Sequence, residues 1–310
     1  MAALICGSFA FDTVMLFRDR FGQHILPDKV HMLNVSFLVP EMRREFGGCG
    51  GNVAYNLKLL QGEGYALGTV GEDFAPYANW MDQNALPRDY LQVIPDTYTA
   101  QAFITTDLDD NQITAFHPGA MAFSGRLGIP EDRSFQVGLI APDSFEGMVR
   151  HGEEMAAAGL KFIFDPGQAM TQFDGPALLA MLDRASYLAV NDYECEMVLN
   201  RTGLSRDQLA ERVEGLIVTL GAKGSVIYAK GQTIEIPPAR PTTVVDPTGC
   251  GDAYRAGLLL GIMTDRDWQT TGRIASLAGA SKIECHGPQN HTFTWEAFQD
   301  RFAENFGFRP

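Results

Sequence analysis

The sequence lacks the features of proteins that bind nucleic acid or enter membranes. It has 24 Lys and Arg residues against 38 Asp and Glu residues, a formal net charge of −14, and an acidic surface repels phosphate backbones and anionic headgroups. No apolar stretch approaches the length that spans a bilayer, and the N-terminus MAALICGSFAFD has no basic region of a secretory signal. We therefore expect a cytoplasmic protein whose partners are neither nucleic acid nor membrane.

Three chemical motifs are also missing. The five cysteines are widely scattered without a CxxC pair, which argues against a disulfide framework or a zinc site. The six histidines show no metal-like spacing. Nor does the chain contain G-x-x-x-x-G-K-[ST], so a bound phosphate would need a cradle other than a P-loop.

What the chain does have is an alternation of apolar strands and amphipathic helices. Such strands are predicted at 3–7, 65–70, 137–141, 161–165, 186–190 and 215–219, and helices at 52–60, 144–158 and 192–199. Buried strands that alternate with helices form a parallel sheet covered on both faces. The fold class predicted is therefore α/β, doubly wound, with a mostly parallel sheet flanked by helices.

Two segments interrupt this alternation. Residues 13–45 and 90–120 read as extended, hairpin-rich chain, as in TAQAFITTD and NQITAFHPG around the turn DLDDN. We expect them to pair into a small β-sheet lid over a large domain made of 1–12, 46–89 and 121–310. A sheet extension with no moving role is the alternative. An exposed sheet edge also makes the lid a candidate homodimer contact.

The most informative stretch is VVDPTGCGDAYRAGLLLGIM at 244–263, where a β-like run turns into an apolar helix. Gly249 and Gly251 allow close approach of a ligand to the backbone. The free N–H groups of the first helical turn form an anion site. Asp252, at that turn, can orient a hydroxyl and accept its proton during phosphoryl transfer. A carboxylate that merely caps its own helix is the alternative.

Five segments, in chain order, carry a family resemblance. They are GSFAFD (7–12), GGCGGNVAYNL (47–57), NDYE (191–194), VTLGAKGS (218–225) and DPTGCGDAYRAG (246–257). Together they resemble the signatures of the ribokinase-like, or PfkB, carbohydrate and nucleoside kinases. The chain departs from the usual pattern at Pro247 and at Cys250, where alanine is common. The resemblance implies an ATP-dependent phosphotransferase with an alcohol acceptor.

The resemblance also implies roles at the phosphoryl group. Asp252 becomes the expected catalytic base, and the transferring phosphoryl group lies among Thr248, Gly249, Cys250 and Gly251. Because helix N-termini lower thiol pKa values, Cys250 invites a redox role, but we interpret it as a small side chain beside glycine.

On the sugar side, Asp12 resembles the family aspartate that accepts hydrogen bonds from two hydroxyls. Gly47, Gly48 and Asn52 repeat the combination of backbone clearance with one polar side chain. Turn chemistry is the alternative for Asp12 and for the glycines.

The nucleotide is expected against Thr219, Gly221 and Gly224, while Lys223 is as readily solvated as bound. By resemblance, Asn191 and Glu194 order Mg²⁺ and the phosphates, with Glu194 acting through water. The N-x-x-E spacing equally fits a capping box.

A further cofactor is implied by the same likeness. Asp246 is a candidate ligand, with nearby carbonyl groups, for a monovalent cation such as K⁺.

For the substrate, the run 33–42, the segment FHPGAM and the combination DPTG-x-GDAYRAG resemble bacterial adenosine kinases. The expected reaction is phosphorylation of the 5′-hydroxyl of a nucleoside, with adenosine preferred. Ser8, Asp12 and Ser36 would meet the ribose, and Phe103 and Phe116 would stack on the purine. Packing between lid and body is the alternative for the two phenylalanines. A ribokinase- or fructokinase-type sugar kinase and a catalytically silent nucleoside or sugar sensor are the alternative functions.

Overall fold

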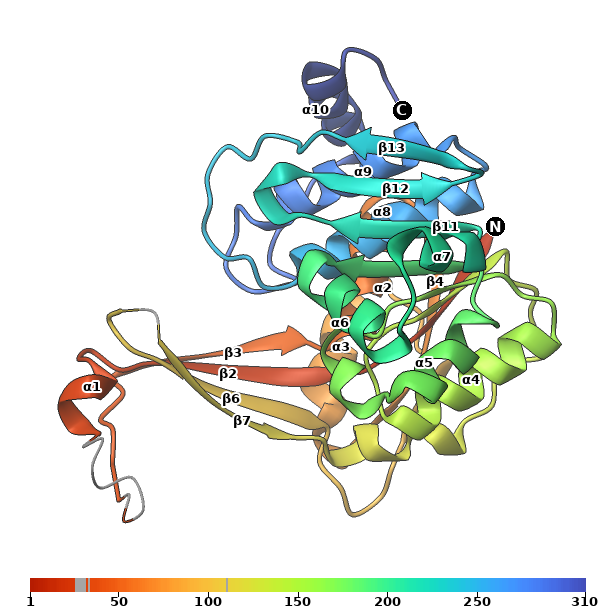
Figure 1. The fold of residues 1–310 in the computed structure, drawn as a ribbon. Helices are drawn as coiled ribbons and strands as arrows, with labels where there is room; N and C mark the ends of the chain where they lie inside the picture. The colour runs from red at the N-terminus through yellow and green to blue at the C-terminus, as the bar shows by residue number, and fades with distance from the viewer. Residues whose placement is uncertain (26–31, 33, 110) are drawn as a thin grey trace.

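A large sheet forms the centre of the molecule, and a small sheet projects from one side of it (Figure 1). The structure, a computed structural model, describes residues 1–25, 32, 34–109 and 111–310. Within these residues the large sheet has nine strands in the order β13-β12-β11-β10-β9-β8-β1-β4-β5. They are β1 (Ala2–Cys6), β4 (Glu63–Val70), β5 (Tyr90–Val93), β8 (Val137–Ile140), β9 (Phe162–Phe164), β10 (Tyr187–Asn191), β11 (Gly215–Thr219), β12 (Ser225–Ala229) and β13 (Gln232–Ile236).

The strand order confirms the predicted doubly wound α/β fold. Every neighbouring pair from β11 to β5 is parallel. The hairpin of β12 and β13, which the sequence analysis did not predict, adds two antiparallel strands at one edge. Its two-residue turn places Lys230 at φ 52° and Gly231 at φ 71°, the left-handed conformations that tight hairpins favour.

Helices cover both faces of the large sheet, and each layer has its own apolar core. One face carries α2 (Cys49–Leu59), α3 (Ala75–Gln83), α8 (Cys250–Met263), α9 (Trp268–Lys282) and α10 (Trp295–Phe306). The other carries α4 (Phe145–Ala157), α5 (Gly175–Leu182), α6 (Asp192–Thr202) and α7 (Arg206–Arg212). Among the helices of the described residues, none combines the length and apolar character needed to cross a membrane.

The small sheet, called the lid below, combines two distant segments of the chain. Its order is β3-β2-β6-β7, with β2 (Ala10–Leu16) and β3 (Glu41–Gly47) from the first segment and β6 (Ala100–Thr106) and β7 (Gln112–His117) from the second. The central pair, β2 and β6, is parallel. The short helix α1 (Phe21–His24) follows β2, and residues 26–31 and 33 of the predicted lid segment lie outside the described residues.

One boundary of the predicted lid is wrong. Tyr90–Val93 does not join the small sheet but pairs in parallel with β4 as the edge strand β5 of the large sheet. A four-residue strand carries too little pattern to reveal its partner. The strands of the second lid segment therefore start only at Ala100, with β6.

Candidate active site

The turn before α8 has the geometry of an anion site. Gly249 adopts φ 81°, and a Cβ added there would lie 2.7 Å from Cβ of Pro288, so only glycine fits. The amide of Cys250 donates to the carbonyl of Pro247 at 3.1 Å. For the amides of Gly251 and Asp252 we find no acceptor among the described residues. These free donors point from the positive end of a 14-residue helix.

Asp252 stands beside these amides. Its Oδ2 accepts a hydrogen bond of 2.8 Å from Nδ2 of Asn52, and it receives no capping bond from a backbone amide of the described chain. The capping alternative therefore does not describe this carboxylate. Burial, with Asp165 as a further contributor, raises the pKa of Asp252 to about 6, against the hydrogen bond from Asn52. A carboxylate with such a pKa is a stronger base than a solvated one while still ionised at neutral pH.

Asn52 is fixed in orientation by a residue that the sequence analysis missed. Its Oδ1 accepts from Nε2 of Gln289 at 2.9 Å, and Oε1 of Gln289 in turn accepts from Nε1 of Trp80 at 3.0 Å. This chain of donors leaves the Nδ2 of Asn52 facing Asp252. No sequence signal marks Gln289, since it lies in a loop some 237 positions from Asn52.

Glycines before α2 bring the chain close to the first strand. Gly48, at φ 85°, would place a Cβ 2.5 Å from the carbonyl oxygen of Ser8. The hydroxyl of Ser8 accepts from the amide of Cys49 at 3.2 Å. Ser8 thus supports the start of α2 and remains able to donate its hydroxyl proton.

Asp12 lies against Gly47, in the glycine segment that precedes α2. A Cβ on Gly47 would lie 2.3 Å from Oδ2 of Asp12, so the glycine leaves room for the carboxylate. Burial, and then the neighbouring Glu45, raise the pKa of Asp12 to about 6. Asp12 is thus a second carboxylate held in an unfavourable environment, which is typical of functional sites.

The structure does not bring Ser36 close to Ser8 and Asp12. It is exposed and precedes Phe37, whose ring packs 4.7 Å from that of Phe17 and 5.0 Å from that of Phe21. Both of these lie at the far end of the lid from Asp12, beyond the end of β2 or in α1 (Figure 1). The structure therefore does not place Ser36 beside Asp12, and the contact of Ser36 with a ribose stays a prediction.

The residues that are predicted to bind the nucleotide lie at, or just after, the last residues of β10 and β11. Asn191 and Glu194 form a capping box: Oδ1 of Asn191 accepts from the amide of Glu194 at 2.7 Å, and Oε2 of Glu194 accepts from the amide of Asn191 at 2.8 Å. Burial raises the pKa of Glu194, and Asp165 adds to this. Thr219 ends β11, and its hydroxyl donates to the carbonyl of Val190 at 3.4 Å.

The glycine loop after β11 divides into a structural and an open part. Gly224, at φ 90°, would place a Cβ 2.1 Å from the carbonyl oxygen of Ile236, so it is required by packing. Gly221 and Lys223 are exposed, and Gly221 has open space around it. The loop therefore has room for a ligand at Gly221. Gly224 instead packs against Ile236 and fixes the conformation of the loop.

A buried ion pair supports the base of α8. Nε and Nη2 of Arg255 donate to the two carboxylate oxygens of Asp165 at 3.0 and 3.1 Å, and Nη2 also donates to the carbonyl of Ala189 at 3.1 Å. Burial lowers the pKa of Arg255, but Asp165, Glu194 and Asp252 all oppose this and leave it raised. The guanidinium is thus the positive centre of three carboxylates. The signal in the sequence that could have indicated this contact is the spacing of three residues between Asp252 and Arg255 on one helix.

The family assignment rests on most of the chain. Residues 20–295 match the pfkB family of carbohydrate kinases. The chain is a pfkB family kinase. A nucleoside kinase of Methanocaldococcus jannaschii is 33% identical over 274 residues, which cover 88% of this chain and 90% of that protein. The resemblance drawn from the five sequence segments is confirmed.

Solved structures agree with this assignment. A nucleoside kinase of Burkholderia thailandensis in complex with inosine has a TM-score of 0.91 and 51% identity, with 99% of each chain covered. The M. jannaschii nucleoside kinase has a TM-score of 0.89 and 30% identity, with 98% of each chain covered. The protein is thus a ribokinase-fold phosphotransferase that acts on a nucleoside or sugar hydroxyl.

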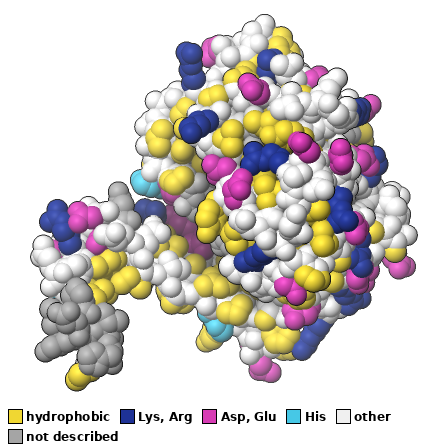
Figure 2. Space-filling model, in the orientation of Figure 1, with side chains coloured by type: hydrophobic (Ala, Val, Ile, Leu, Met, Phe, Trp, Pro, Cys, Tyr) yellow, Lys and Arg dark blue, Asp and Glu magenta, His cyan; other side chains and the backbone are white. Residues whose placement is uncertain are grey.

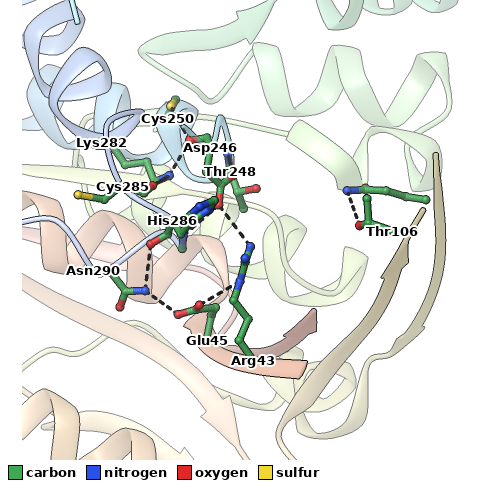
Figure 3. Close-up of polar contacts among 12 residues, drawn as sticks. Arg43, Glu45, Thr106, Asp246, Thr248, Cys250, Lys282, Cys285, His286 and Asn290 are labelled. Atoms are coloured by element: carbon green, nitrogen blue, oxygen red, sulfur yellow. Dashed lines mark hydrogen bonds and ion pairs between the residues drawn. The ribbon is translucent and has the colours of Figure 1, made fainter. Parts of the chain in front are cut away.

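The lid of this kinase contacts the body beside the anion turn (Figure 3). Nδ2 of Asn290 donates to Oε2 of Glu45 at 2.6 Å. Arg43 lies 3.2 Å from Glu45 and 3.9 Å from Asp246, measured between charged atoms. The molecule is hollowed between lid and body, and acidic side chains line the recess (Figure 2). Strand β3 therefore already meets the loops that flank the phosphate site.

The strand register places the two predicted stacking residues on opposite faces of the lid. Phe116 pairs with Ala102, and Ala102 pairs with Asp12. Phe103 pairs with Thr13 instead. Since paired residues share a face and successive residues alternate, Phe116 lies on the Asp12 face and Phe103 on the other. The two rings therefore do not share one face of the lid, and stacking on the purine stays a prediction for Phe116, the one on the Asp12 face.

Cys250 has no sign of thiol reactivity. Burial raises its pKa to about 11, although the positive charge of Lys282 opposes this. A thiol that stays protonated is a poor nucleophile, in agreement with its interpretation as a small side chain.

Proposed function

We propose that this kinase transfers the γ-phosphoryl group of ATP to the 5′-hydroxyl of a purine nucleoside. The observation that carries the proposal is the hydrogen bond between Asp252 and Asn52, because it joins the anion turn of α8 to the sugar side of the site. Adenosine is the substrate expected from the sequence. The relative solved with inosine, 51% identical over 99% of the chain, supports inosine as a second candidate.

In the proposed reaction, Asp252 is the general base. Its Oδ2 is held by Asn52, and its Oδ1 would accept the proton of the 5′-hydroxyl. The hydroxyl oxygen attacks the γ-phosphorus, a new O–P bond forms, and the bond to the β–γ bridging oxygen breaks so that ADP leaves. The amides of Gly251 and Asp252 stabilise the phosphoryl oxygens. The proton on Asp252 passes to solvent after product release.

The nucleotide would lie along the ends of β10 and β11, near Thr219 and Gly221. The same B. thailandensis kinase has been solved in complex with ADP-inosine, which supports this use of an adenine nucleotide. The carboxylate chemistry of Glu194, with Asp165 nearby, fits Mg²⁺ held through water. When bound with the nucleotide, Mg²⁺ would neutralise the negative charge of the phosphates.

The nucleoside would lie on the Asp12 face of the lid. The carboxylate of Asp12 can accept bonds from two ribose hydroxyls, and Ser8 can donate to one of them. Phe116 shares this face and is 53% exposed, so its ring is open to a purine. Closure of the lid over the bound nucleoside would complete the site.

A panel assay tests this function. ADP release would be measured with ATP and Mg²⁺ against adenosine, inosine, other nucleosides, ribose and fructose. A nucleoside should give the highest kcat/KM. A preference for ribose or fructose would instead identify a sugar kinase. Nucleoside binding without turnover would identify a silent sensor.

The pH dependence of kcat/KM should follow the two carboxylates. Asp252 must be ionised to accept a proton and Asp12 to accept hydroxyl groups, and the pKa of each is about 6. The rate should therefore fall as the pH decreases through 6, with a limiting slope above one. Initial rates from about pH 5 to pH 8 at low nucleoside concentration would measure it. The variant Asp12→Asn should reduce the slope to one, and a flat profile would contradict both roles.

Replacement of Phe116 with Ala should weaken nucleoside binding. Base stacking contributes ~1–3 kcal/mol, so KM for the nucleoside should rise about 10-fold to 100-fold. KM for ATP should not change. Phe103→Ala is the matched control, because it removes the same ring from the opposite face of the lid. Equal effects of the two substitutions would show that the rings act through packing.

The homodimer contact expected through the lid stays a proposal. Three exposed apolar side chains, Met42, Phe103 and Ile113, are 69%, 41% and 44% exposed. Their register places all three on the face opposite Asp12. A second copy could cover this face without entering the nucleoside site.

A further inference from the structure

A buried lysine lies directly behind the anion turn. Lys282 is the last residue of α9 and is 0% exposed. Its Nζ donates to the carbonyl of Asp246 at 2.7 Å and to the carbonyl of Cys285 at 3.0 Å. The first carbonyl belongs to the loop that enters α8 and the second to the loop that leaves α9 (Figure 3). One ammonium group thus joins the two loops.

Each oxygen of Asp246 already accepts a hydrogen bond from another part of the chain. Besides the carbonyl bound to Lys282, Oδ1 accepts from the amide of Thr248 and Oδ2 from the amide of Gly287, each at 2.9 Å. A potassium ion on the same carbonyl would lie beside a buried positive charge, and repulsion between like charges is strong where water is excluded. Asp246 therefore does not fit the monovalent cation that the family resemblance implied.

We propose that the ammonium group of Lys282 takes the place of that cation, so that phosphoryl transfer by this kinase is independent of K⁺. An ammonium group and a potassium ion have the same charge and similar radii, and both bind backbone carbonyl oxygens. The lysine has the advantage of being covalently attached, so the charge is present without binding from solution.

Lys282 would act as a positioning residue. Its Cε lies 3.8 Å from the position of a Cβ on Gly249, so its side chain supports the turn whose amides face the phosphoryl group. The two loops also share backbone bonds, since the amides of Val245 and Asp246 donate to the carbonyl of Ile283 at 2.9 and 3.1 Å. The ammonium group completes this contact and would hold the turn in its phosphate-binding shape.

The native enzyme provides the first test. Its kcat/KM for ATP and its thermal stabilisation by ADP would be measured with K⁺, Na⁺ or tetramethylammonium as the sole monovalent cation at equal ionic strength. Both quantities should agree within about twofold across the three salts, since Lys282 already supplies the charge. A saturable increase specific to K⁺ in either quantity would overturn the proposal.

The variant Lys282→Ala provides the second test. In tetramethylammonium its kcat/KM should be about 10-fold to 100-fold below native, as for other supporting residues of charged sites. Ammonium, methylammonium or K⁺ should restore a large part of the rate and of the stabilisation by ADP, because the emptied position can accept a cation. Lys161→Ala, which removes an exposed lysine paired with Glu214, is the control and should behave as native.

The outcomes separate this proposal from the function on which it rests. A folded Lys282→Ala protein that no cation rescues would show that the lysine is structural only. If that variant does not fold, the salt series on the native enzyme decides. Absence of nucleoside phosphorylation in every salt would remove the proposed substrate class, whereas phosphorylation activated by K⁺ would leave the function intact and overturn the role of Lys282.

Discussion

Replacement of Asp252 with Asn is expected to lower kcat by about three to four orders of magnitude, at the upper end of what a general base contributes. The amide has nearly the same shape and can still accept the bond from Asn52, so the site should stay assembled. It cannot accept a proton at neutral pH. KM for ATP should change little because the amides of the anion turn are untouched. Steady-state kinetics with both substrates would measure these effects.

The same substitution should not destabilise the fold. The pKa of Asp252 is raised to about 6 in the folded protein from an ordinary 3.8, so the protonated form is favoured by folding. That stabilisation is fully present below pH 3.8 and is lost as the pH rises through 6. At pH 7 the neutral amide avoids this loss, which amounts to roughly 2–3 kcal/mol. The variant should therefore melt a few degrees higher than the native enzyme.

Asp265→Asn is the matched control for Asp252→Asn. It makes the same chemical change just beyond the opposite end of α8, where Asp265 is exposed and adopts φ 51°, a conformation that Asn tolerates well. Its kcat should equal the native value. Turnover of Asp252→Asn within tenfold of native would remove the carboxylate from the role of base.

Replacement of Arg255 with Met should have the largest effect on stability. It leaves the carboxylate of Asp165 buried without its partner, and the loss of one member of a buried pair costs about 3–5 kcal/mol. The melting temperature should fall by about 5–8 °C. Arg255 also lowers the pKa of Asp252, so the acidic limb of the rate profile should move to higher pH in any variant that remains folded.

The variant Arg88→Met is the control that separates the loss of a buried ion pair from the loss of any arginine. Arg88 makes two hydrogen bonds of 2.8 Å to Asp82, a geometry like that of Arg255, but both partners are exposed. An exposed pair contributes about 0–1 kcal/mol, so the control should melt within a few degrees of native. A similar shift in the two variants would mean that burial of the Arg255 pair has no special cost.

Local patterns predicted the parts of this kinase that depend on neighbours in the sequence. Apolar runs located the six predicted strands, and helical spacing located α2, α4 and α6. The turn before α8 was predicted because glycines and a carboxylate at a helix start have one clear chemistry. The capping box of Asn191 and Glu194 was foreseen as an alternative for the same reason.

Features that depend on register or on distant contacts were not predictable in this way. Phe103 and Phe116 were expected together because both lie in the same hairpin. Their faces depend on which residues the turn between them pairs, and a shift of one residue would have reversed the result. Gln289 acts through the side chain of Asn52 in α2, and Lys282 acts through the carbonyl of Asp246; both partners lie far away in sequence. The residues that flank Gln289 and Lys282 in the sequence carry no pattern that indicates these partners.

The parallel pairing of β2 with β6 has a consequence for how the molecule assembles. Ala10 pairs with Ala100, and the chain that connects β2 to β6 includes two strands of the large sheet, β4 and β5, and two of its covering helices, α2 and α3. The pair can close only after this intervening chain has compacted, since contacts between distant segments carry a large loop-closure cost. The lid therefore cannot be removed or transferred to another protein as one continuous segment. Because it consists of two segments, a chimaera that exchanges it needs four junctions in the chain.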